Sequence, residues 1–353
     1  ILCLFGSEIV PFEVDGVKAG NTTWGHRLFH RDHPEPLAVP SPEAYESALE
    51  AAGVVVSCGK RREAMKAQLD RLAQEVGGRV VEDEELLTVL SEIVEWPCIL
   101  RGDFPESFLD LPKEVLVTSL KEHQKSFCIE NAKGALLPYF LTAANRPDDP
   151  EGFVKSGNEW VLKARLYDAR FFFAEDRRTP LEARLDKLSH LTFHRELGSY
   201  VEKTERITRI AERLATARGL DKAQAREAAR LCKADLVTLM VGEFPELQGI
   251  MGGEYLRHEG QPKDVWMAVK EHYRPISAEG EIPWAVEPGA TYRFADLSGR
   301  QGAFATMDYS EDQPLFFLGR EMSLADLGLR GGTKKPAKLG AQSLNCPKCG
   351  GAL

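Results

Sequence analysis

Asp235 is the residue of this chain whose surroundings most strongly suggest chemistry. It lies in an apolar segment, KADLVTLMVGEFPELQGIMG, that we expect to be helical until Gly242 and Pro245 end it. A carboxylate among apolar neighbours requires a partner, because burying an unpaired charge is costly. Asp235 is therefore expected either to act in a site or to bond to a neighbouring helix.

A metal site would need a histidine beside this aspartate. Enzymes that use adjacent His and Asp side chains hold a divalent ion that activates water. His194, which we expect on a helix about forty positions earlier, could supply one ligand, but the residue before Asp235 is Ala234. Since that ligand is missing, we expect a structural role for Asp235. A metal-dependent phosphohydrolase built on His194 and Asp235 remains an alternative.

Two groups of side chains could contact an anionic partner. Lysines and neutral amides commonly bind phosphate, and the first group lies between two apolar runs: His123, Gln124 and Lys125. The second recurs every three or four residues on a helix expected over 200–217: Lys203, Arg206, Arg209 and Arg213. Glutamates lie beside the second group, so an exposed turn and a solvated mixed-charge face are the simpler interpretations.

Cysteines and histidines give only partial metal patterns. Cys346 and Cys349 form one CPKCG half of a zinc ribbon, whereas tetrahedral zinc needs four ligands. A zinc-stabilised adaptor completed by another chain is the third hypothesis. The other five cysteines are scattered among apolar residues, as in reduced cytosolic proteins. His26 is expected in an ordinary surface loop.

Composition narrows the class of protein. The chain has 353 residues, 43% hydrophobic and 28% charged, which allows two or three domains of an ordinary protein without membrane spans. The net charge of −9 argues against a protein that coats nucleic acid, although a local basic face is compatible with it. There is neither a signal peptide nor an initiator Met, so we expect the chain to begin inside a longer protein.

Periodicity predicts an α+β fold in several parts. Over 1–150, helices are expected at 41–52, 60–77 and 83–96, and strands at 54–56, 114–120 and 135–143. Residues 151–280 read as an all-α domain. We predict short strands over 281–329, and a linker with the CPKCG half-knuckle over 330–353.

Ordered motifs over residues 1–275 resemble the beta subunit of bacterial heterotetrameric glycyl-tRNA synthetase. They are VKAGNTTWGHR (17–27), FPESFLDLPKEVL and KEHQKSF within 104–127, GNEWVLKARLYDARFFFAED (157–176), FHRELGSYVEKTERI (193–207), the Asp235 segment, and EHYRP (271–275). After EHYRP we expect the chain to leave the family pattern, without the family's further helices and anticodon-binding domain. The tail resembles an uncharacterised family of small β-rich domains that carry CPxCG ribbons.

The resemblance implies a cytoplasmic aminoacyl-tRNA synthetase subunit of protein biosynthesis. It would bind tRNA(Gly), while a separate alpha subunit uses ATP and Mg²⁺ to activate glycine and completes the heterotetramer. It also implies a synthetase α+β module followed by a helical domain of degenerate His-Asp phosphohydrolase type. In such a domain Ala234 is expected at the position of the missing histidine. The resemblance implies no catalytic residue in this chain. The implied RNA-facing candidates are His123, Gln124, Lys125, Arg165, Lys203, Arg206, Arg209, Arg213 and Lys233.

Overall fold

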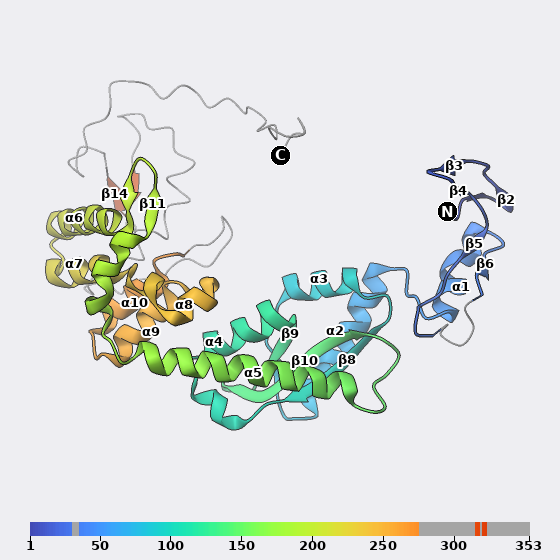
Figure 1. Cartoon of the computed structure of the whole chain (residues 1–353), viewed down its shortest axis with the longest axis horizontal. Helices are drawn as coiled ribbons and strands as arrows, with labels where there is room; N and C mark the ends of the chain where they lie inside the picture. Colours follow the sequence, from blue (N-terminus) through green and yellow to red (C-terminus); the bar gives the residue numbers. More distant parts are fainter. Residues whose placement is uncertain (30–34, 275–314, 318–319, 323–353) are drawn as a thin grey trace, which may run out of the picture. The chain divides into compact units, whose positions relative to one another are not determined.

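The chain combines helices with small sheets and divides into two compact units, Ile1–Glu175 and Asp176–Leu353 (Figure 1). The computed structural model describes residues 1–29, 35–274, 315–317 and 320–322. This content agrees with the predicted α+β class. The predicted boundaries at 150, 280 and 329 stay predictions, and the predicted linker with Cys346 and Cys349 lies outside the described residues.

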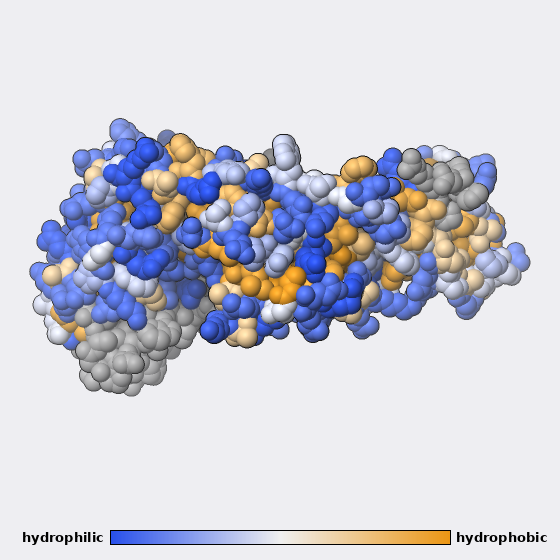
Figure 2. Space-filling model, turned by 90° about the horizontal axis from the view of Figure 1, so that it is seen from below, coloured by the Kyte–Doolittle hydropathy of each residue, from blue (hydrophilic) through white to orange (hydrophobic). Residues whose placement is uncertain are grey.

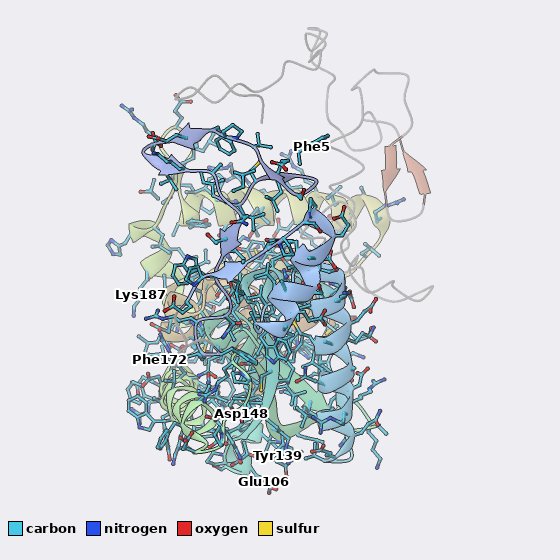
Figure 3. All side chains as sticks on the ribbon, turned by 90° about the vertical axis from the view of Figure 1, so that its right-hand side faces the viewer. Phe5, Glu106, Tyr139, Asp148, Phe172 and Lys187 are labelled. Carbon is cyan, nitrogen blue, oxygen red and sulfur yellow. The ribbon has the colours of Figure 1, made fainter. Side chains whose placement is uncertain are left out.

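The first unit begins with short paired strands whose side chains are exposed or only partly buried. Its three antiparallel pairs are β1 (Leu4–Phe5) with β2 (Glu8–Ile9), β3 (Glu13–Val14) with β4 (Val17–Lys18), and β5 (Thr22–Thr23) with β6 (Leu37–Ala38). Phe5, labelled in Figure 3, is 83% exposed. The short helices η1 (Pro42–Ala44) and α1 (Tyr45–Ala51) follow.

His26 is buried, which corrects the expected surface loop. Its Nε2 atom lies 3.0 Å from Oδ1 of Asn145, which also accepts the amide N–H groups of Glu95 and Trp96. Because a buried histidine needs such a partner, this bond anchors the loop.

A four-stranded antiparallel sheet forms the centre of the first unit, in the order β7-β9-β10-β8. Its strands are β7 (Arg79–Val80), β8 (Pro97–Asp103), β9 (Ser126–Glu130) and β10 (Leu136–Asn145). Helices α2 (Cys58–Gln74) and α3 (Glu84–Ile93) pack a core of Met65, Leu69, Leu87 and Leu90 against Phe127, Ile129 and Leu141. The predicted helices and the strand over 135–143 are thereby confirmed.

Two predicted strands of this unit are wrong. Residues 114–120 lie in α4 (Lys113–Thr118) and in the π-helical turn η3 (Ser119–His123). Val115, Leu116 and Leu120 are buried at helical spacing, so the apolar run is one face of a helix. At 54–56 the carbonyl groups of Val55 and Val56 accept hydrogen bonds from the Arg61 side chain, and no strand forms.

The outer edge of β8 is closed by side chains. Gln68 accepts the N–H of Ile99 and donates to the carbonyl group of Pro97, while Glu159 accepts the N–H of Asp103. Glu159 belongs to α5 (Phe153–Asp176), the long helix that follows β10 in the chain. The short helix η2 (Glu106–Asp110) lies between β8 and α4 in the sequence. Since these groups are satisfied, the edge is a poor template for another strand.

The second unit is helical within the described residues, apart from two short hairpins. Its elements are η4 (Leu181–His190), β11 (Thr192–His194), β12 (Gly198–Ser199), α6 (Tyr200–Arg218), α7 (Lys222–Leu231), η5 (Ala234–Val237), α8 (Leu239–Glu243), η6 (Pro245–Leu247), α9 (Ile250–His258), α10 (Lys263–Glu271), β13 (Leu315–Phe317) and β14 (Arg320–Met322). The described helices include none long and apolar enough to cross a membrane.

Candidate nucleic-acid interface

Helix α6 is held at both ends by local sequence signals. Ser199 and Glu202 form a capping box, and hydrogen bonds from Ser199 hold the pKa of the Glu202 carboxyl below its usual range. Gly219 ends the helix with a left-handed φ of 66°. These caps fix which α6 side chains face outward.

The outward face of α6 carries arginines without carboxylate partners. Arg206, Arg209 and Arg213 form no ion pair within the described part of the chain, and we call these three the α6 cationic edge. Arg206 donates to the carbonyl group of Leu197 at 3.0 Å, which fixes its direction. Arg209 and Arg213 are exposed.

The glutamates beside this edge are partly engaged elsewhere. Glu212 pairs with Arg226 at 3.1 Å and lies 4.0 Å from Lys222, both on α7, and Glu202 belongs to the capping box. The expected mixed-charge face is therefore less balanced than the sequence indicates. A positive edge of this kind suits phosphate groups.

Lys203 lies apart from the cationic edge. Its Nζ atom sits 3.5 Å from the centre of the Phe193 ring and 5.6 Å from that of Tyr200, and burial lowers the pKa of Lys203. The lysine thus packs over the β11–β12 hairpin.

A hollow of about 360 Å³ adjoins the cationic edge. Arg209, Arg226 and Arg230 line it together with Asp186, Glu205 and Glu212, so its charges are balanced. Arg226 and Arg230 already pair with carboxylates. The hollow therefore has less unpaired positive charge for binding an anion than the α6 cationic edge has.

The His123, Gln124 and Lys125 group lies in the first unit, where η3 leads into β9. Gln124 donates to the carbonyl group of Asn158 at 3.2 Å, and Lys125 has a left-handed φ of 47° and pairs with Glu122 at 3.4 Å. His123 and Lys125 are exposed. The group is an anchored turn, and its contact with RNA stays a prediction.

Two candidates lie away from open surface. Arg165 is half-buried on α5. Lys233 is only 5% exposed, and its Nζ atom lies 2.7 Å from Nε2 of His272 and 3.5 Å from the centre of the Tyr273 ring. Burial lowers the pKa of Lys233 to about 8. Its interior position corrects its placement on an RNA-facing surface.

Asp235 lies in the turn η5 rather than in the predicted long helix. It is 0% exposed, and its Oδ2 atom accepts the amide N–H groups of Gly249 at 2.5 Å and Gly252 at 3.0 Å. Its Oδ1 atom has no hydrogen-bond partner among the described residues. Asp235 therefore caps the start of α9, as the structural interpretation predicted.

The residues of the metal hypothesis do not fit a metal ion. His194 lies exposed on β11 rather than on a helix, and its Nδ1 atom accepts the N–H of Glu196. One oxygen of Asp235 is committed to two amides, and Ala234 offers no ligand. Among the described residues no group of three or more His, Cys, Asp or Glu side chains could hold a metal.

The sequence did not predict two buried polar side chains of the second unit, those of Asp176 and His272. Asp176 accepts the amide N–H groups of Leu239 and Met240, at 3.0 and 2.9 Å, and the hydroxyl of Tyr255 at 3.0 Å. His272 lies 2.6 Å from the carbonyl group of Val269 through Nδ1. Only the position of Asp176 at the end of the apolar run FFFAED could have indicated a buried carboxylate.

Known proteins match most of the chain. The family described as glycyl-tRNA synthetase beta subunit matches residues 1–296. Relatives named glycine–tRNA ligase beta subunit include those of Bacillus subtilis (strain 168), 42% identical over 299 residues, and Myxococcus xanthus (strain DK1622), 43% identical over 308 residues. These alignments cover 84% and 86% of the chain, and 43% of each relative. The chain thus spans less than half the length of these relatives.

Proposed function

The chain belongs to the glycyl-tRNA synthetase beta-subunit family, and we propose that it binds tRNA(Gly) within a glycine–tRNA ligase. The catalytic steps are assigned to a separate alpha subunit, which uses ATP and Mg²⁺ to activate glycine and then transfers it. The chain itself supplies no catalytic residue. Its part is to bind and orient the RNA.

The α6 cationic edge is the observation that carries this proposal. Arg206, Arg209 and Arg213 lie on one face of a capped helix and have no ion-pair partner in the part of the chain that the structure describes. A chain with a net charge of −9 needs such a local concentration of positive charge to approach an RNA backbone. A-form RNA is recognised mainly through backbone and shape, which exposed arginines suit.

A gel-shift titration with tRNA(Gly) tests the proposal. The chain is titrated at low salt with and without the alpha subunit, and we expect a shifted complex that weakens as salt rises, because bound cations release counterions. If no complex forms at low salt even with the alpha subunit present, the proposal fails.

The metal-dependent phosphohydrolase is disfavoured as a rival. Ala234 and the hydrogen bonds of Asp235 are what a degenerate relative of that fold would carry, so we propose a degenerate His-Asp origin for the helical domain over 151–280. The rival requires stoichiometric metal and nucleotide hydrolysis. Metal analysis together with a hydrolysis assay separates the two functions.

The compartment and the tail are also proposals. We assign the chain to the cytoplasm, which is supported by the five free thiols of the described residues, Cys3, Cys58, Cys98, Cys128 and Cys232. Zinc at Cys346 and Cys349 rests on the CPKCG spacing alone and would need two ligands from another chain. Measuring bound zinc before and after Cys346→Ser tests it.

A further inference from the structure

Helix α5 exposes a row of large apolar side chains along one face. The stripe, named here the α5 stripe, consists of Phe153, Trp160, Ala164, Tyr167 and Phe171. These positions are separated by seven, four, three and four residues, so they lie on one face of the helix. Phe153 is 74%, Trp160 73% and Phe171 61% exposed. The other side of α5 buries Leu162, Leu166 and Ala169 within the unit.

The stripe is long and rigid. From Phe153 to Phe171 it extends about 27 Å at 1.5 Å per residue. Tyr167 is held by an edge-on contact with the buried Phe108, whose ring centre lies 5.1 Å from its own. α5 lies along the lower side of the first unit in Figure 1, and Figure 2, viewed from below, shows apolar side chains gathered on this face. Exposed apolar surface of this extent marks an interaction site.

One edge of the stripe is positive. Lys163 and Arg170 are both exposed and lie seven residues apart on the same edge. Both cations lie over aromatic rings: Arg170 lies 4.8 Å from the ring centre of Tyr167 and 4.9 Å from that of Phe108, and Lys163 lies 6.0 Å from that of Tyr167. No ion pair of either cation is found among the described residues. Acidic side chains on a partner would complete this edge.

We propose that the α5 stripe docks an amphipathic helix of the companion alpha subunit, with an apolar face and an acidic edge. This inference rests on the proposed function, since the name beta subunit implies a second kind of chain. Seven-residue spacing of large side chains is the pattern that packs against another helix. Trp and Tyr in such a stripe are the residue types that dominate interface energies.

Charge and spacing favour this occupant over two others. In an antiparallel pair of identical helices each edge faces the same edge of its partner, so Lys163 and Arg170 would approach their own copies. Single-stranded RNA stacks successive bases about 3.4 Å apart, whereas the aromatic residues of the stripe are separated along the helix by about 10.5 Å, or by about 6 Å for Tyr167 and Phe171. In a parallel pair of identical helices, Asp168 of one copy would face Lys163 and Arg170 of the other, so charge alone does not exclude that pair. The crosslinking experiment below distinguishes it from the alpha subunit.

The test measures binding of the alpha subunit and of tRNA(Gly) to the same variants of the full chain. Trp160→Ser combined with Phe171→Ser is expected to weaken alpha-subunit binding at least about 100-fold and to leave tRNA binding by the chain alone unchanged. Ile93→Ser, at an apolar residue of α3 that is 64% exposed, is the matched control and should change neither. Circular dichroism confirms that the variants fold.

A photo-crosslinking side chain at position 160 identifies the occupant directly. Crosslinks to the alpha subunit support the inference; crosslinks to a second copy or to tRNA overturn it. Unchanged alpha-subunit binding by the double variant also overturns it but leaves the proposed function standing. If the wild-type chain binds neither the alpha subunit nor tRNA(Gly), the proposed function itself fails.

Discussion

The carboxylate of Asp235 lies 2.5 Å from the amide nitrogen of Gly249, at the point where α9 begins. The residue that first suggests catalysis is therefore a helix cap between two segments fourteen residues apart. Burial raises the pKa of Asp235 to about 6, against the opposing effect of the two amides. Its effect on stability should consequently depend on pH.

Replacing Asp235 should reveal this capping role. Asp235→Ala leaves two buried N–H groups without a partner and is expected to lower the free energy of unfolding by about 1–3 kcal/mol. Asp235→Asn keeps an acceptor oxygen and should lower the free energy of unfolding less than Asp235→Ala does. Urea unfolding of both variants at pH 7 measures the difference.

The pH dependence of Asp235→Asn provides a second check. Because the folded pKa is raised, the folded state binds the proton more tightly, and the contribution of Asp235 to stability decreases as pH rises from about 4 to about 6. The variant should therefore gain stability relative to wild type between pH 5 and pH 8. Equal differences at both values would show that Asp235 does not titrate in this range.

His272 should act in the opposite sense. Burial, with Lys233 nearby, lowers the pKa of His272 to about 3, so the folded protein keeps it neutral. The stability that neutral His272 contributes to the folded protein is complete above pH 6.5 and is lost as pH falls toward 3. At pH 5 the free energy of unfolding should already be lower by about 2 kcal/mol. We expect the stability difference between wild type and His272→Gln to shrink by that order between pH 7 and pH 5 in thermal unfolding; a constant difference would contradict this.

The α6 cationic edge should control RNA affinity. Arg209→Glu with Arg213→Glu is expected to weaken tRNA(Gly) binding roughly 10- to 100-fold at low salt and to reduce the salt slope by up to about 2. Arg62→Glu with Arg71→Glu on α2 is the control, because those arginines already pair with Glu84 and Glu75. If both double variants bind alike, the edge is not the RNA surface.

Two glycines give a matched test of the fold. A Cβ atom at Gly102 would overlap the Phe140 ring, closer than van der Waals contact allows, so Gly102→Ala should destabilise the first unit by about 1–3 kcal/mol. Gly157 lies in α5 with nothing near such an atom, and Gly157→Ala should stabilise by about 0.5–1 kcal/mol. Chemical denaturation of each variant measures both; a reversed order would contradict the described packing.

Local signals in the sequence predicted the helices well. Aspartate is a preferred residue at a helix start, and the side chains of Asp83 and Asp221 cap α3 and α7 by accepting the N–H groups of Leu86 and of Ala223 and Gln224. By contrast, the β-branched run 114–120 suggested a strand, and only its packing on one buried face makes it helical.

The chemistry of single residues was harder to predict. Lys233 and Asp235 are two positions apart, and no periodicity shows that one lies against His272 and the other against Gly249. Such partners come from elements distant in sequence, so spacing alone cannot supply them. The α6 cationic edge was predicted as a row of charges, but the pairing of Glu212 with α7 depends on helix packing.

Binding of labelled tRNA(Gly) to the chain with the alpha subunit, followed by fluorescence anisotropy over a range of salt concentrations, tests the central claim most directly. The account predicts saturable binding at about 50 mM salt that weakens steeply as salt rises and that Arg209→Glu with Arg213→Glu reduces. Absence of binding at that salt concentration would contradict it.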